Sequence, residues 1–163
     1  MWAFLAVALC AILPSVAVAT ETNRRGQVTD LPIPRYVSIK GGEANARRGP
    51  AMDRRIDWVF VRNNLPLKVT DEYGHWRRVE DSDGKGGWVH YSLLSGARSV
   101  VVTEAETLLR GARSYEATPV ASLEVGVVAN LERCQDGWCR LTVQGHAGWA
   151  PRSAIWGDGG EID

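Results

Sequence analysis

The sequence predicts an all-β chain that folds as two small β-barrels in tandem. A duplication is the first reason: residues 69–96 and 131–157 share a spaced set of residues, in which Trp76 matches Trp138, Arg78 matches Arg140 and Gly87-Trp88 matches Gly148-Trp149. A repeat of about 60 residues is a small domain rather than a solenoid unit. The second reason is the run of short β-branched segments separated by Gly, Asp or Asn, with no sustained helical period. Short strands joined by tight turns are typical of a small barrel.

The chain divides into five segments on this reading. We expect a signal peptide over residues 1–19, an extended linker over 20–34, a first barrel over 35–96, a second barrel over 97–157 and a C-terminal tail over 158–163. The linker prediction rests on its polar composition and its two prolines, Pro32 and Pro34.

The first 19 residues are uncharged and almost wholly apolar, and Ala17-Val18-Ala19 fits the small-x-small rule for signal peptidase. The apolar run ends at Pro14 and is too short to span a hydrocarbon core of about 30 Å. A lipid anchor on Cys10 is the alternative, but bulky Leu9 precedes it where a small residue is preferred. We expect an exported protein, periplasmic or extracellular, that does not span a membrane after cleavage.

A two-residue turn at Asp136-Gly137 predicts a disulfide. Asp-Gly favours a type I′ hairpin, because both central residues need positive φ. In that register Gln135 faces Trp138, and the next pair outward is Cys134 and Cys139. These cysteines are expected to bond in an oxidising compartment. The matching positions of the first repeat are Glu72 and Arg77, a pair of opposite charges facing each other across two strands.

These residues resemble the bacterial SH3-like (SH3b) domain family, in tandem copy, over residues 35–157. The matching features are Asn45-Ala46-Arg47 before a long loop, Gly-Trp-Cys-Arg at the first hairpin of the second repeat, and Gly-Trp-Val followed by Ser-Leu-Leu-Ser-Gly. The second repeat departs from the Asn-x-Arg pattern with Leu108-Leu109-Arg110. The resemblance implies five-stranded barrels that bind cell-wall or peptide ligands, often beside a hydrolase domain.

The composition excludes several classes of function. A formal net charge of zero gives no overall attraction for nucleic acid. The two cysteines of the mature chain are expected to be a disulfide, which leaves no thiolate nucleophile. The three histidines, His75, His90 and His146, have no metal-ligand spacing. We therefore expect no catalytic residue, metal or cofactor.

The candidate ligand residues lie in the first repeat. Trp88 and Trp149 recur in both repeats and are expected to be core residues. Aromatic residues without an aromatic counterpart are better candidates for exposed ligand contacts, and clustered arginines of the long first loop offer partners for carboxylates. The predicted site contains Arg47, Arg48, Arg54, Arg55, Trp58, Tyr73 and Tyr91.

Together these observations favour a non-catalytic, exported binding module that recognises peptidoglycan or an envelope protein. The alternative is a structural or regulatory subunit of a separately encoded envelope enzyme. An enzyme with its own active site is the least favoured class.

Export gives the first testable expectation. Intact-mass measurement of protein recovered outside the cytoplasm should give a chain that begins at Thr20, because cleavage follows Ala19. A retained Met1, or a lipid mass on Cys10, would contradict it.

Overall fold

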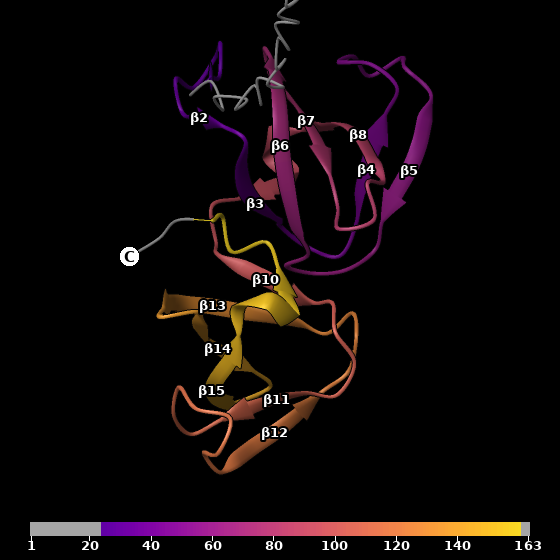
Figure 1. The fold of residues 1–163 in the computed structure, drawn as a ribbon. Helices are drawn as coiled ribbons and strands as arrows, with labels where there is room; N and C mark the ends of the chain where they lie inside the picture. Colours follow the sequence, from indigo (N-terminus) through magenta and orange to yellow (C-terminus); the bar gives the residue numbers. More distant parts are fainter. Residues whose placement is uncertain (1–23, 161–163) are drawn as a thin grey trace, which may run out of the picture.

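The computed structural model describes residues 24–160, and the predicted signal peptide lies outside these residues. Two seven-stranded antiparallel sheets, each curled into a barrel, are stacked one above the other (Figure 1). The prediction of an all-β chain with two SH3-like barrels in tandem is confirmed. No helix of residues 24–160 is long and apolar enough to cross a bilayer.

The two sheets have the same strand order. The first runs β5-β4-β8-β7-β6-β3-β9 and the second β12-β11-β15-β14-β13-β10-β16. The first consists of β3 (Arg35–Ile39), β4 (Ala44–Arg47), β5 (Ile56–Phe60), β6 (Pro66–Tyr73), β7 (Trp76–Glu80), β8 (Gly86–His90) and β9 (Leu94–Ser95). The second consists of β10 (Ser99–Val102), β11 (Thr107–Arg110), β12 (Pro119–Leu123), β13 (Val128–Gln135), β14 (Trp138–Val143), β15 (His146–Pro151) and β16 (Ile155–Trp156). Single 3₁₀ turns, η1 (Tyr91–Leu93) and η2 (Arg152–Ala154), precede the last strands.

Each barrel has its own apolar core, built by the alternation of side chains along its strands. The core of the first repeat centres on Leu67, Val69 and Val89, and that of the second on Leu109, Leu141 and Val100. A barrel of about 60 residues buries only a modest core. Contacts outside the core therefore matter for its stability.

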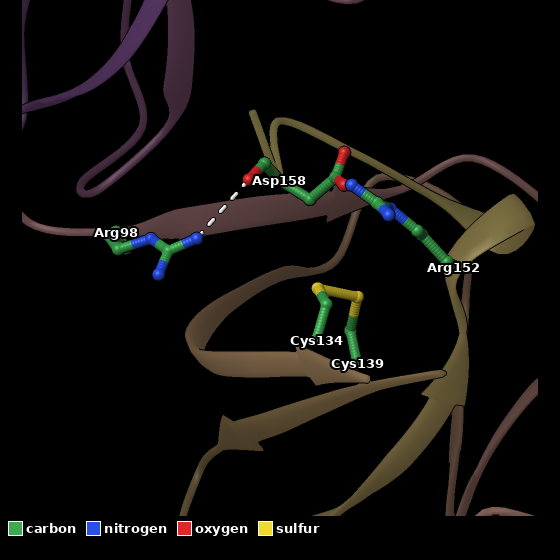
Figure 2. Close-up of a disulfide and its surroundings, with 5 residues drawn as sticks. All are labelled: Arg98, Cys134, Cys139, Arg152 and Asp158. Carbon is green, nitrogen blue, oxygen red and sulfur yellow. Dashed lines mark hydrogen bonds and ion pairs between the residues drawn. A yellow bond between two sulfur atoms is a disulfide. The ribbon is translucent and has the colours of Figure 1, made fainter. Parts of the chain in front are cut away.

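The first hairpin of the second repeat has the predicted geometry. Asp136 and Gly137 both have positive φ, and Gln135 pairs with Trp138. Cys134 and Cys139 lie opposite one another with Cα atoms 4.0 Å apart and form the predicted disulfide (Figure 2). The bond closes a short loop, so it acts on the register and twist of the hairpin more than on chain entropy.

The C-terminal residues of the second repeat are fixed beside this hairpin. Arg152 donates its backbone N–H to Gly137 O (2.9 Å) and its side-chain Nε to the Asp158 carboxylate (2.5 Å). The Asp158 carbonyl accepts a longer bond from Arg98 (3.4 Å), as Figure 2 shows. The described part of the tail is therefore held to the barrel from both sides.

Residues 24–33 differ from the extended linker expected for them. They form a short hairpin, β1 (Arg24–Arg25) with β2 (Pro32–Ile33), that lies beside β6 in Figure 1. The reason is the side chain of Glu72, which the hairpin covers completely. Gly26 is placed so close that an added Cβ would lie 2.4 Å from the Glu72 carboxyl carbon. Only glycine fits this approach.

Five groups surround the Glu72 carboxylate. Backbone N–H groups of Val28 and Thr29 donate to one oxygen at 3.0 Å each, and the Thr29 hydroxyl donates to the other at 2.7 Å. Arg35 adds an ion pair at 2.6 Å and Arg77, the predicted cross-strand partner, one at 3.5 Å. Burial alone raises the pKa of the Glu72 carboxyl, but the bonds from Thr29, Arg35 and Val28 outweigh it and lower that pKa to about 2.

The two repeats are joined by polar and aromatic contacts. Ser38 and Ser99 share a buried hydrogen bond of 2.5 Å between their hydroxyls, and Asn64 donates to Asn130 at 2.7 Å. The Arg62 side chain donates to the carbonyl of Gly126. Tyr36 packs edge-on against Trp156, with ring centroids 5.1 Å apart. These bonds hold the barrels in one arrangement.

The recurring tryptophans Trp88 and Trp149, expected in the core, differ in burial. Trp149 is buried, and guanidinium groups of Arg113, Arg133 and Arg140 lie 5.4–6.0 Å from its ring. Trp88 is only half-buried. The prediction of a core position therefore fits Trp149 better than Trp88. The three arginine side chains lie over the ring of Trp149 and shield part of it from solvent.

The Glu72→Gln variant should lose stability at neutral pH. The folded-state pKa of this carboxyl is depressed from 4.5 to about 2, so its contribution is present above about pH 4.5 and is lost as the pH falls toward 2. We expect denaturant unfolding to show a loss of about 2–3 kcal/mol at neutral pH that shrinks on acidification.

The matched control is Glu132→Gln, which removes an exposed carboxylate of the second repeat that accepts bonds from Arg140 and Thr142. It should change stability much less, because solvent screens exposed pairs. An equal loss in both variants, or a Glu72→Gln loss that persists unchanged at acidic pH, would contradict the buried-carboxylate account.

Candidate functional site

A hollow of about 330 Å³ opens on the first repeat, and we call it the Trp76 groove. It is lined by Asn45, Arg47, Met52, Trp76, His90, Ser92 and Leu93. Trp76 is 8% exposed and forms part of the floor. The lining combines aromatic and apolar surface with a few polar groups, which is the usual character of a ligand site.

The sheet positions these side chains. Along β4, Ala44 and Ala46 are buried in the barrel, so the alternation places Asn45 and Arg47 on the other face. The pairing of β7 with β8 sets Trp76 opposite His90, whose rings meet edge to face with centroids 5.5 Å apart. Strand register therefore fixes both walls of the groove.

Arg47 has a structural bond as well as a place in the lining. Its Nη1 donates to the carbonyl of Arg54 (2.7 Å) and holds the long first loop closed. Arg110 makes the same bond to the carbonyl of Ala117 (2.9 Å) in the second repeat. Gly87 lets β8 come close here, since an added Cβ would lie 2.6 Å from Arg47 O. The arginine thus closes the loop in both repeats.

His75 and Tyr91, with the lining residue His90, form an aromatic rim at the groove. Tyr91 lies 5.5 Å from His75 and 5.0 Å from His90, and the two imidazoles are 5.9 Å apart. Tyr91 is 50% exposed. His90 Nδ1 shares a hydrogen bond of 2.7 Å with the Ser92 hydroxyl and accepts a longer one, 3.4 Å, from the Ser92 backbone N–H. The rim offers flat faces and donor groups together.

The matching hollow of the second repeat is smaller, about 180 Å³. Tyr115 stands where the first repeat has Met52, and its ring packs against Trp138 with centroids 4.8 Å apart. Trp138, the counterpart of Trp76, does not line this hollow, whereas Glu104 and Glu106 do. Equivalent positions therefore give a tryptophan-floored groove in one repeat and an acidic hollow in the other.

The predicted arginines mostly have intramolecular partners. Arg48 and Arg55 both bind Asp57, at 3.1 and 2.6 Å, and Arg54 lies 3.7 Å from Asp53. The bonds from Arg55 and then Arg48 lower the pKa of the Asp57 carboxyl. Of the four predicted arginines, only Arg47 lines the Trp76 groove.

The predicted aromatic residues lie in separate places. Tyr91 stands in the rim, and exposed Tyr73 ends β6 directly opposite Trp76. Trp58 lies on β5, 42% exposed, with the Lys85 ammonium 5.9 Å from its ring. It lines a different groove, between the two repeats. The structure thus places Arg47 in the lining of the Trp76 groove and Tyr91 in its rim, and it leaves Tyr73 and Trp58 outside the lining.

Several groove residues were absent from the sequence prediction: Asn45, Met52, His75, Trp76, His90, Ser92 and Leu93. Trp76 has an aromatic counterpart in Trp138, so the preference for aromatic residues without a counterpart does not select it. A comparison of equivalent positions in the two repeats could have found the groove. Met52 in the first repeat corresponds to Tyr115 in the second, and His90 corresponds to Pro151.

Within residues 24–160, no group of three or more His, Cys, Asp or Glu side chains is arranged to hold a metal ion. The two cysteines of this part of the chain are bonded to each other. The lining of the Trp76 groove offers aromatic faces, hydrogen-bonding groups and one guanidinium.

Comparison with known proteins gives two findings. A family model described as "Bacterial SH3 domain" matches twice, over residues 40–96 and 104–157, which is more than half of the chain. No curated protein matches the chain.

Among solved structures, NlpC2 and NlpC1 from Trichomonas vaginalis are similar, each at 12% identity and a TM-score of 0.35. They align with 75% and 76% of this chain but with only 47% and 45% of their own chains. The chain thus spans about half the length of these structures.

Proposed function

Because the chain belongs to the bacterial SH3 domain family, we propose that it is an exported binding module that holds peptidoglycan in the Trp76 groove. It binds without catalysing a reaction. Its two repeats have different roles: the first repeat binds the ligand, and the second repeat supports the first.

The contrast between the repeats carries this proposal. The fold alone does not require an open groove, since the second repeat forms the same barrel with Tyr115 packed on Trp138. The first repeat keeps its tryptophan in the lining and adds a rim of Tyr91, His75 and His90. A site with such rigid aromatic faces gains contact area at little cost in side-chain entropy.

The chemistry of the lining suits a peptide-bearing glycan. Aromatic faces pack against sugar rings and peptide planes, while Asn45, Ser92 and His90 offer donors and acceptors for amides and hydroxyls. Arg47 supplies a guanidinium near the groove, and guanidinium groups pair well with carboxylates such as those of a peptide stem. Peptidoglycan presents all of these partners, with sugar rings in its glycan strands and amides and carboxylates in its stem peptides.

The location fits the same function. A disulfide persists in oxidising compartments such as the periplasm or the extracellular space. The predicted signal peptide leads to the same compartments. An envelope ligand is therefore accessible to the folded protein.

Co-sedimentation with purified sacculi tests the proposal. Tyr91→Ala removes an exposed rim ring, and Met52→Tyr places in the groove the residue that packs on the tryptophan in the second repeat. Each should weaken binding by about tenfold, a loss of about 1.4 kcal/mol. Thermal unfolding should change little, because both residues are exposed.

A control is matched to the Tyr91 variant. Tyr115→Ala removes an exposed ring from the second repeat and should not change binding to sacculi. If the wild-type protein does not sediment with sacculi, the peptidoglycan proposal fails. Stable co-purification of one envelope enzyme would then favour the regulatory-subunit alternative.

A further inference from the structure

Strand β5 forms an unprotected edge of the first sheet. Among the described residues it pairs with β4 alone and ends the strand order. Ile56, Trp58 and Val59 are 41, 42 and 39% exposed. A terminal strand with large exposed apolar residues presents free backbone groups that favour pairing with another strand.

The matching edge of the second repeat lacks this character. Strand β12 begins at Pro119, which has no N–H to donate, and Ala121 occupies the position of Trp58. Proline on an edge is one of the ways in which proteins prevent strand addition. Both terminal strands are exposed, but an edge with a tryptophan and without proline is found in the first repeat.

The apolar surface of β5 extends beyond the strand itself. Val61 and Val125, 71 and 59% exposed, line with Trp58 a groove of about 560 Å³ between the repeats. A five-residue strand pairing alone buries too little area for a specific interface, which needs about 1,200 Å² or more in total. The adjoining valines add apolar area for such an interface.

Opposite charges flank the two ends of β5. Arg54 and Arg55 immediately precede the strand, whereas Asp81 and Asp83 line the groove beside its second half. The Arg54 side chain is 60% exposed. When two identical strands pair antiparallel, the N-terminal end of β5 in each copy lies beside the C-terminal end of β5 in the other. The arginines of each copy then lie beside the aspartates of the other, at two equivalent places. Arg55 is bound to Asp57, and Arg62, which lines the same groove as the aspartates, is bound to the carbonyl of Gly126. The complementarity therefore rests on Arg54 at the first end and Asp83 at the second.

The described ends of the chain itself lie elsewhere on the sheet. The β1–β2 hairpin covers Glu72 on β6, and Gly159 lies beside Tyr36 on β3. Both strands belong to the opposite end of the strand order from β5.

We propose that a second copy of this chain pairs antiparallel with β5, giving a dimer with two-fold symmetry. Isologous pairing of this kind is the commonest form of homo-oligomer. If the proposed function holds, the dimer presents two Trp76 grooves, and a polymeric ligand engages both with increased avidity.

Sedimentation equilibrium of the mature protein tests the dimer without any ligand. The wild type should shift from monomer toward twice the monomer mass as concentration rises through the micromolar range. Trp58→Lys should remain monomeric, because a charge on the edge opposes strand pairing. The control Tyr73→Lys puts the same charge at an exposed aromatic position away from β5 and should still dimerise.

A charge swap tests the geometry. Arg54→Asp and Asp83→Arg should each weaken the dimer by about tenfold, and the double variant should recover most of that loss. A wild type that stays monomeric at every concentration overturns the proposal. The proposal is also overturned if the Trp58→Lys variant still dimerises. It is overturned as well if the double variant loses affinity by the product of the two single-variant losses. None of these results depends on whether the protein binds sacculi.

Discussion

The buried carboxylate of Glu72 is the interaction on which the first repeat depends most. It is fully covered and receives bonds from the β1–β2 hairpin, from Arg35 on β3 and from Arg77 on β7. One side chain therefore joins three parts of the chain. Because Trp76 is next to Arg77, the same interaction also holds the hairpin that provides the floor of the groove.

In the second repeat, a disulfide joins the two strands of the matching hairpin. Glu72 pairs with Arg77 at the register position where Cys134 pairs with Cys139. Small barrels have limited cores, so an additional tie at the first hairpin matters. A disulfide fixes that hairpin without help from other segments, whereas a carboxylate requires the N-terminal hairpin to satisfy it. This difference explains why residues 24–33 are ordered against the first repeat.

The surroundings of the shared tryptophan differ between the two repeats. Both keep the arginine that closes the first loop, Arg47 or Arg110, because the barrel needs it. The positions that face the tryptophan do not close the loop, and they differ between the repeats. Met52 and His90 occupy them in the first repeat, and Tyr115 and Pro151 occupy them in the second. In the proposed function, similar folds thus supply one binding surface and one supporting domain.

The sequence was sufficient for features governed by local rules. The Asp136-Gly137 turn sets the register that joins the cysteines, and β-branched runs mark the strands of both barrels. The hairpin at residues 24–33 was not predictable in this way, because its order comes from contacts with Glu72, more than 40 positions along the chain. Trp76 was missed for a related reason: recurrence identifies a residue that the fold needs, yet such a residue can also line a site.

The most direct test of the different roles of the two repeats is an NMR titration of ¹⁵N-labelled protein with soluble disaccharide-peptide fragments of peptidoglycan. The indole N–H groups of Trp76 and Trp138 report on equivalent positions within one molecule. The account predicts that the Trp76 signal, with the backbone signals of Asn45 and Tyr91, shifts in a saturable way while Trp138 stays in place. Saturable shifts at Trp138 with none at Trp76 would contradict it.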